Sequence, residues 1–211
     1  TILMLIAPTR GSVVFMGRNL SDLRKAELRA SRSEMQMVFQ DPFASLNPRM
    51  RIVDVIGEAP VVHGLVAPRE REAYVAEIMG HVGLDASLAR RFPHQFSGGQ
   101  RSRIGIARAL AVKPSFLVCD EAVAALDVSI QAQVLNLFIR LREEFGLTYL
   151  FISHDLGVVR HLSDRVVIMY LGRIVESAST EEVFARCNHP YTQALLAEIP
   201  RLEATKRAYI P

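Results

Sequence analysis

Apolar and polar residues alternate along the chain in blocks that predict helices and strands in turn. After residue 98, short runs that are apolar on both faces are separated by segments in which apolar residues recur every three to four positions. In the clearest of these helices, Val134, Leu137, Phe138 and Leu141 fall at i, i+3, i+4 and i+7 and share one face. Buried strands separated by amphipathic helices are typical of a parallel sheet covered on both sides, so the pattern predicts an α/β fold.

The same pattern places the individual elements. The predicted strands are residues 12–15, 35–39, 116–119, 149–152, 165–170 and 173–176. Helices are predicted over 99–112, around 134–141 and over 156–162. Ser179 and Glu182 form a capping box for a helix that runs to about Arg186, and Pro190 suits the first position of a last helix.

Two further segments carry separate expectations. The segment 52–91 has helical spacing and no strand pattern, which indicates a helical insertion in the α/β chain. The first residues, ILMLIAPTRG, look like the end of a buried helix that Pro8 and Gly11 stop. Ser21 or Asp22 is expected to cap a polar helix that runs to about residue 31.

Composition narrows the class of protein. Of the 211 residues, 50% are hydrophobic and 22% are charged, which is a globular composition. The net charge of +3 is too small and too scattered to indicate binding to nucleic acid. No apolar run approaches the roughly 18 residues that cross a bilayer. Two cysteines, Cys119 and Cys187, cannot form a disulfide framework and favour a reducing compartment, with Cys119 read as a buried small hydrophobe.

Candidate chemistry gathers at the predicted carboxyl ends of strands, where open α/β sheets bind ligands. Ser97-Gly98-Gly99-Gln100 precedes a helix, where backbone amides and the helix dipole favour a phosphate; the alternative is an ordinary loop with a serine cap. Arg101, Arg103 and Arg108 on the same helix form either a solvated face or a surface near a partner subunit.

The other two candidates are acidic and imidazole groups. Asp120-Glu121 follows a buried strand, where the pair suits Mg²⁺ and a base that polarises water, or else two solvated carboxylates. His154 follows the next strand and either contacts a phosphoryl oxygen or is an ordinary polar residue at a strand end. Ser153-His154-Asp155 is no hydrolytic triad, because neighbours along a chain cannot converge as a triad must.

Together these segments resemble the ATP-binding cassette (ABC) family over essentially the whole chain. FSGGQRSRIGIARAL resembles the signature motif and its helix, and FLVCDEA resembles the Walker B strand. AALD resembles the D-loop, FISHD the switch-histidine segment, and MVFQDPFASLNPRM the Q-loop. The last string and NHPYTQALLAEIP are similar to the subgroup that serves oligopeptide and dipeptide importers.

The resemblance implies a role for each matching residue. Glu121 is the expected general base, Asp120 orders the Mg²⁺ shell, and Gln40 contacts Mg²⁺ or the attacking water. His154 holds the γ-phosphate of ATP. The signature residues contact an ATP held mainly by the opposite subunit, and Asp127 communicates across the dimer; these signature residues are Ser97, Gly98, Gly99 and Gln100.

The resemblance also implies an architecture: a P-loop NTPase core with a mainly parallel sheet and a helical subdomain. Residues 1–40 match a remnant of the N-terminal half of the RecA-like core, and 41–96 the Q-loop and helical subdomain. Residues 97–178 match the signature helix and the rest of the core, and 179–211 a C-terminal helical extension. The implied partners are permease subunits, a second ATPase subunit packed head to tail, and indirectly a solute-binding protein, at the cytoplasmic face of the cell membrane.

One motif of the family does not occur in the chain. No G-x-x-x-x-G-K-[ST] phosphate loop is present, so the matched segment begins after the Walker A loop and the first strands. We therefore expect this chain alone to be inactive and the intact protein to hydrolyse ATP. The alternatives are a non-hydrolytic ABC-like interaction or regulatory module, and a soluble ABC ATPase that acts on nucleic acid or ribosomes.

Overall fold

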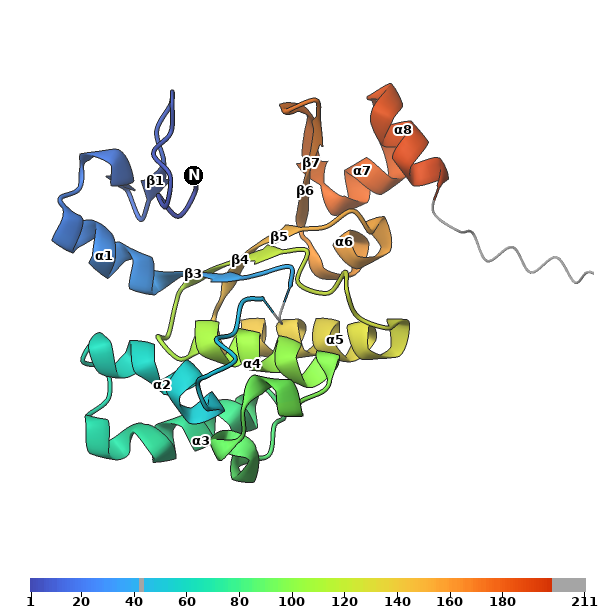
Figure 1. The fold of residues 1–211 in the computed structure, drawn as a ribbon. Helices are drawn as coiled ribbons and strands as arrows, with labels where there is room; N and C mark the ends of the chain where they lie inside the picture. The colour runs from blue at the N-terminus through green and yellow to red at the C-terminus, as the bar shows by residue number, and fades with distance from the viewer. Residues whose placement is uncertain (42–43, 199–211) are drawn as a thin grey trace, which may run out of the picture. The chain divides into compact units, whose positions relative to one another are not determined.

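The fold consists of two compact units. The computed structural model describes residues 1–41 and 44–198, and the chain divides by its internal contacts into 1–152 and 153–211 (Figure 1). Each unit is described by itself. The Q-loop residues 42–43, the end of the segment NHPYTQALLAEIP, and the rest of the C-terminal extension from 199 on lie outside the described residues.

A three-stranded parallel sheet organises the first unit. Its strands are β3 (Met35–Val38), β4 (Phe116–Asp120) and β5 (Thr148–Ile152), in that spatial order. The register sets Val38 opposite Cys119 and Asp120 opposite Ile152, so the carboxyl ends of the strands meet at one edge. Cys119 is fully buried, and burial raises the pKa of its thiol, which confirms that it is a buried small hydrophobe.

Two long helices lie along one face of this sheet (Figure 1). They are α4 (Gly98–Leu110) and α5 (Val128–Phe145), which confirm the predicted helices. Phe138 of α5 is fully buried and meets the rings of Tyr149 and Phe151 edge-on, with centroids 5.6 Å apart in both pairs. The apolar stripe that the spacing predicts is therefore the surface that joins α5 to β5.

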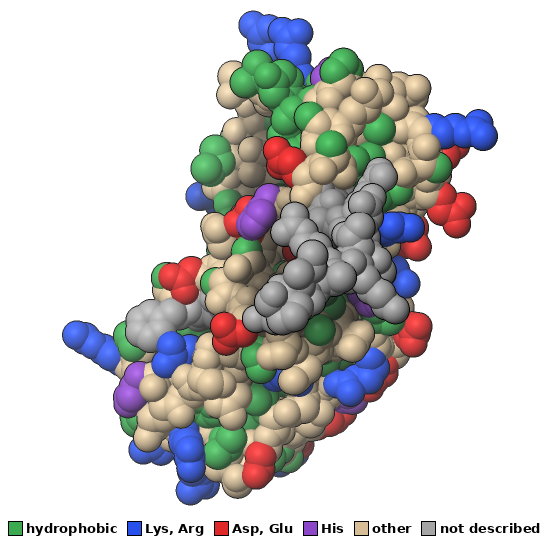
Figure 2. Space-filling model, turned by 90° about the vertical axis from the view of Figure 1, so that its right-hand side faces the viewer, with side chains coloured by type: hydrophobic (Ala, Val, Ile, Leu, Met, Phe, Trp, Pro, Cys, Tyr) green, Lys and Arg blue, Asp and Glu red, His purple; other side chains and the backbone are tan. Residues whose placement is uncertain are grey.

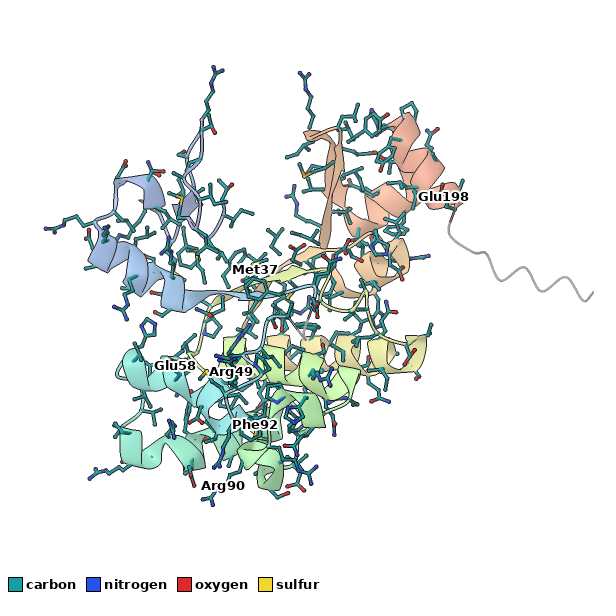
Figure 3. All side chains as sticks on the ribbon, viewed as in Figure 1. Met37, Arg49, Glu58, Arg90, Phe92 and Glu198 are labelled. Carbon is teal, nitrogen blue, oxygen red and sulfur yellow. The ribbon has the colours of Figure 1, made fainter. Side chains whose placement is uncertain are left out.

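The predicted helical insertion is confirmed. It holds α2 (Ile52–Val62) and α3 (Arg71–His81), with no strand among residues 52–91. Glu58, Arg90 and Phe92 lie in or next to this layer, whereas Met37 lies in the sheet (Figure 3). Short 3-10 turns complete the layer; they are Pro68–Glu70, Ala86–Arg90 and Pro93–Gln95.

The start of the chain differs from the prediction. The first eleven residues contain no helix, and Leu5 and Ile6 are 65% and 73% exposed, so the expectation of a buried helix there is wrong. The strand predicted over 12–15 is confirmed in part. It forms a hairpin of two short strands, β1 (Val14–Phe15) and β2 (Arg18–Asn19).

The expected helix cap is also displaced. Residues Leu20–Asp22 form a 3-10 turn, and the helix α1 spans Lys25–Glu34. The Glu27 side chain accepts the backbone N–H of Arg24 at 3.1 Å, so an acidic side chain inside the first turn replaces Ser21 or Asp22 as the group that fixes this end.

The second unit is built on an antiparallel ribbon. It comprises α6 (Leu156–Leu162), β6 (Arg165–Tyr170), β7 (Arg173–Ser179), α7 (Thr180–Arg186) and α8 (Pro190–Ala197). Among the described strands, β6 pairs with β7 alone, so it does not join the parallel sheet as its apolar pattern suggested. Buried side chains of α6, β6 and α7 form the core of this unit.

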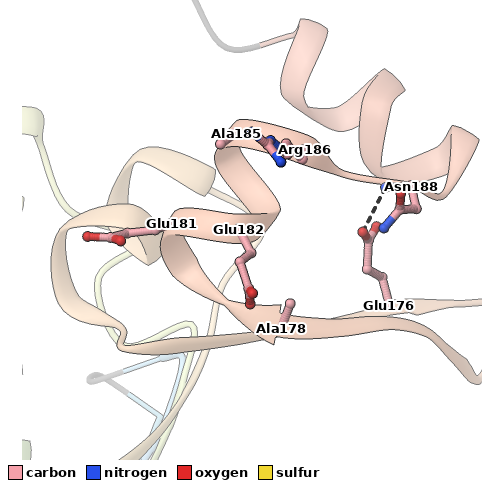
Figure 4. Close-up of a pocket in the computed structure, with 7 residues that line it drawn as sticks. All are labelled: Glu176, Ala178, Glu181, Glu182, Ala185, Arg186 and Asn188. Carbon is pink, nitrogen blue, oxygen red and sulfur yellow. Dashed lines mark hydrogen bonds between the residues drawn. The ribbon is translucent and has the colours of Figure 1, made fainter.

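The predicted capping box of α7 is confirmed. Ser179 Oγ accepts the Glu182 N–H, and the Glu182 carboxylate accepts from both the Ser179 hydroxyl and its backbone N–H. These hydrogen bonds to the carboxylate lower the pKa of Glu182, first through the hydroxyl and then through the N–H. The shallow pocket beside α7 contains none of the predicted site residues (Figure 4).

Candidate functional site

The acidic pair lies at the carboxyl end of the central strand, as the sequence predicts. Asp120 is the last residue of β4, and Glu121 follows it with a φ of +45°, a left-handed conformation that is uncommon outside glycine. The Glu121 N–H donates to the Ile152 carbonyl oxygen at 3.0 Å, and its carbonyl oxygen accepts from the Ala124 N–H at 3.0 Å. These two backbone hydrogen bonds hold the sharp turn that places Glu121 at the carboxyl end of β4.

The residue after the neighbouring strand reaches the same carboxylate. Gln40 lies two residues beyond β3, and its Nε2 donates to Oε2 of Glu121. The structure thus brings together two predicted site residues that are 81 positions apart in the sequence. The parallel pairing of β3 with β4 is the cause, because it places both strand ends at one edge.

This edge has the ligand chemistry that a magnesium ion accepts. No cluster of three or more His, Cys, Asp or Glu side chains occurs within residues 1–41 and 44–198. Protein-bound Mg²⁺ usually keeps several waters and takes only one or two carboxylates together with substrate phosphates. The Asp120 carboxylate and the Gln40 amide oxygen therefore suit a partial shell that phosphates complete.

The glycine-rich segment forms the amino end of α4. Ser97 is the N-cap: its Oγ accepts the Gln100 N–H at 3.4 Å, and the Gln100 Oε1 accepts the Ser97 N–H at 3.0 Å. The open space beside Gly98, where a Cβ atom would meet no atom within 4 Å, lets a ligand approach the first amides of a 13-residue helix. The serine cap is therefore present, and the same helix end leaves room for an anion; phosphate binding there stays a prediction.

The remaining two predicted residues lie just before helices. Asp127 is the exposed N-cap residue of α5, and its side chain makes no capping hydrogen bond. His154 is exposed and belongs to the second unit, in the loop between β5 and α6. Its neighbour Asp155 caps α6 by accepting the N–H groups of Gly157 and Val158 at 2.8 and 3.3 Å, which is a different use of that carboxylate from a hydrolytic triad.

The arginines of α4 are not a solvated face. Arg101 donates to the carbonyl oxygens of Pro93 and His94 at 2.9 and 3.3 Å, and Arg103 donates to that of Val82 at 2.8 Å. Each bond joins the signature helix to the helical insertion or to the loop that follows it. The first of the two expected roles for these side chains is therefore wrong.

Arg108 makes a contact with the Q-loop that neither of its two predicted roles included. Its guanidinium donates to the Ser45 carbonyl oxygen of the Q-loop and stands 5.8 Å from the ring centre of Phe39. Burial lowers the pKa of this guanidinium. Arg108 thus fastens the loop that carries Gln40 to α4. An arginine in a helix usually indicates solvent exposure, so the sequence holds no signal for this contact.

Charge on the visible surface is mixed. On the face in Figure 2, Lys and Arg side chains are interspersed with Asp and Glu side chains. None of the helices formed by the described residues has the length and apolar character needed to cross a membrane.

The parallel sheet with its covering helices is the fold of the P-loop NTPase class. The family description "ABC transporter" matches residues 1–124, and "Oligopeptide/dipeptide transporter, C-terminal region" matches residues 175–211. The chain belongs to the ABC transporter family, which confirms the resemblance and the predicted fold class.

The similar proteins agree with this assignment. The chain is 55% identical over 201 residues to "Oligopeptide transport ATP-binding protein AppF" of Bacillus subtilis, covering 95% of this chain and 61% of that protein. It is 52% identical over 193 residues to "Dipeptide transport ATP-binding protein DppF" of Lactococcus lactis, covering 91% and 62%. The chain therefore spans about three fifths of the length of these relatives.

Solved structures share the fold. One is cbiO1 from Clostridium perfringens, part of the ABC transporter complex cbiONQ, with a TM-score of 0.76 and 26% identity, covering 88% of this chain and 72% of that chain. Another is the ATP-binding cassette MJ0796 in a post-hydrolysis state with ADP and Pi, with a TM-score of 0.72 and 29% identity, covering 83% and 76%.

Proposed function

We propose that this chain is part of the ATP-hydrolysing subunit of an importer for oligopeptides, dipeptides or related nickel or opine solutes. The observation that carries the proposal is the hydrogen bond between Gln40 and Glu121, which joins the Q-loop to the Walker B carboxylate. The similarity of residues 175–211 to the C-terminal region of oligopeptide and dipeptide transporters supports the solute class.

Each residue has a chemical task in this proposal. The Glu121 carboxylate accepts a proton from the attacking water, and Gln40 orients that water or a metal ligand from the side. Asp120 would hold Mg²⁺ through water. The bound ion would neutralise negative charge on the phosphates. His154 donates a hydrogen bond to the γ-phosphate.

The second half of the site comes from another subunit. Ser97, Gly98, Gly99 and Gln100 donate to the γ-phosphate of an ATP on the opposite subunit in a head-to-tail dimer, and Asp127 contacts that subunit. Closure of the dimer assembles the two halves, so that hydrolysis and reopening drive the transport cycle. The complex contains permease subunits at the cytoplasmic face of the membrane, where the Q-loop and helical insertion contact the permease.

Transport in a reconstituted system tests this proposal. The complete gene product, its permease and its solute-binding protein are placed in liposomes, and uptake of a labelled tripeptide is measured with MgATP or with a non-hydrolysable analogue. We expect uptake with MgATP only. Tight ATP binding without turnover or uptake would instead support the non-hydrolytic module, and turnover stimulated by nucleic acid or ribosomes would support the third class.

A pair of serine variants separates the signature role from helix capping. Ser97→Ala and Ser179→Ala remove equivalent caps, whose Oγ–N distances are 3.4 and 3.3 Å, and each should lower the free energy of unfolding by about 1 kcal/mol. Only Ser97→Ala should also lower ATP turnover, by roughly tenfold or more, because a hydrogen bond to a charged phosphate is lost. Urea unfolding and phosphate release measure the two effects. Equal turnover in both variants would contradict the signature role.

A further inference from the structure

The second glycine of the signature segment is in close contact with the helix that follows the D-loop. A Cβ atom at Gly99 would lie 2.5 Å from Cγ2 of Ile130, and 3.8 and 3.9 Å from its Cβ and Cγ1. Gly98, one residue earlier, has nothing within 4 Å of the same position. The two adjacent glycines therefore serve different purposes: Gly98 leaves space for a ligand, and Gly99 makes space for Ile130.

Backbone conformation does not account for Gly99. It lies within the α-helix α4, and it is absent from the glycines with positive φ. In a helix, alanine is more stable than glycine by about 1 kcal/mol, so the helix itself would favour a side chain here. The contact with Ile130 is the local feature of the structure that opposes one.

Ile130 cannot easily move out of the way. It is β-branched and lies in the first turn of α5, where such side chains keep one strongly preferred χ1 rotamer. It is half-buried, and α5 is held to the sheet by the buried ring of Phe138. The Cγ2 methyl group therefore stays in place and limits how closely the first turn of α4 can approach.

We propose that Ile130 is a positioning residue that sets the spacing between the signature segment 97–100 and the D-loop segment 124–127 of one subunit. Both segments face the opposite subunit in the proposed function, on which this inference rests. Their separation decides whether the Gly98 and Gly99 amides reach the γ-phosphate while Asp127 reaches its own partner. The methyl group of Ile130 fixes that separation because it fills the space between the start of α5 and the backbone of α4 at Gly99.

The test adds a methyl group at residue 99 and removes one at residue 130, separately and together, in the complete gene product. The variants are Gly99→Ala, Ile130→Ala, Ile130→Val and the two doubles that combine Gly99→Ala with each change at 130. Valine at 130 keeps the Cγ2 methyl that the Cβ atom introduced by Gly99→Ala would strike, whereas alanine removes it. Valine is therefore the matched control. The readouts are ATP-dependent dimerisation, ATP turnover, and binding of a fluorescent ATP analogue to the monomer.

We expect Gly99→Ala to lower dimerisation and turnover by on the order of 100-fold, because a shift of about 1 Å misplaces the phosphate donors. Monomer binding of the analogue should change less than twofold, since the signature acts on the other subunit's nucleotide. Gly99→Ala/Ile130→Ala should recover at least tenfold over Gly99→Ala, and Gly99→Ala/Ile130→Val should not.

Two results would overturn the inference: equal recovery in both doubles, or a parallel loss of monomer binding in Gly99→Ala, which a general folding defect produces. Absence of turnover in the wild-type protein would instead count against the proposed function. In that case the inference is still tested by ATP-dependent dimerisation and by a double-mutant cycle, in which the unfolding free energies of the single and double variants at 99 and 130 are compared. Additive free energies with unchanged dimerisation would overturn it.

Discussion

Glu121→Gln is expected to lower ATP turnover by the complete gene product by about 10²–10⁴-fold, the contribution typical of a positioned general base. The amide cannot accept the proton of the attacking water, but its oxygen can still accept the hydrogen bond from Gln40 Nε2. The loop geometry should therefore survive, and the variant should accumulate as an ATP-bound dimer. Phosphate release and size-exclusion chromatography with ATP measure both effects.

The matched control for this variant is Glu143→Gln. Glu143 is an exposed carboxylate on α5, and the substitution changes charge and shape in the same way away from the site. Its turnover should stay within twofold of the wild-type rate. If Glu121→Gln still hydrolyses ATP at the wild-type rate, another group must be the base, and the role of the Gln40–Glu121 contact must be reconsidered.

Phe138→Ala is expected to give the largest loss of stability among simple truncations. The side chain is fully buried and packs edge-on against both Tyr149 and Phe151. Emptying such a site typically lowers the free energy of unfolding by about 3–5 kcal/mol, a large part of the roughly 5–15 kcal/mol that stabilises a domain. Urea unfolding of the complete gene product measures the change.

Phe145→Ala is the comparison for this truncation. Phe145 ends the same helix but is 38% exposed, and among the described aromatic contacts its ring meets only the His81 ring, at an interplanar angle of 81°. It should lose less than half as much free energy as Phe138→Ala. Equal losses would mean that α5 is held to the sheet by something other than the apolar stripe.

The helices and strands were predictable where a local signal and the final packing agree. Ser179 and Glu182 cap α7 because their side chains accept N–H groups that a helix start leaves unpaired. Pro190 begins α8 because proline has no N–H group that would need a partner there. The run ILMLI carries the same apolar composition without such partners. Ile2, Leu5 and Ile6 of this run are exposed, because packing, which the local pattern does not encode, decides whether an apolar run becomes a buried helix.

The candidate site was predictable to the level of strand ends. A parallel sheet gathers the carboxyl ends of its strands, which is why Gln40 and Glu121 meet despite their separation in sequence. The contacts of Arg108 with the Q-loop and of Ile130 with Gly99 escaped prediction for a different reason. These contacts depend on how α4 packs against the Q-loop and against α5. The spacing of residues within one helix does not predict how that helix packs against another segment.

The arginines of α4 bear on how far this sequence can diverge. Arg101, Arg103 and Arg108 all donate to main-chain carbonyl oxygens, and every residue type supplies such an oxygen. Substitutions in the insertion or the Q-loop can therefore accumulate while the acceptors persist. Side-chain substitutions on the surface proposed to meet the permease should therefore leave these three hydrogen bonds intact, whereas replacing any of the three arginines should remove one of them.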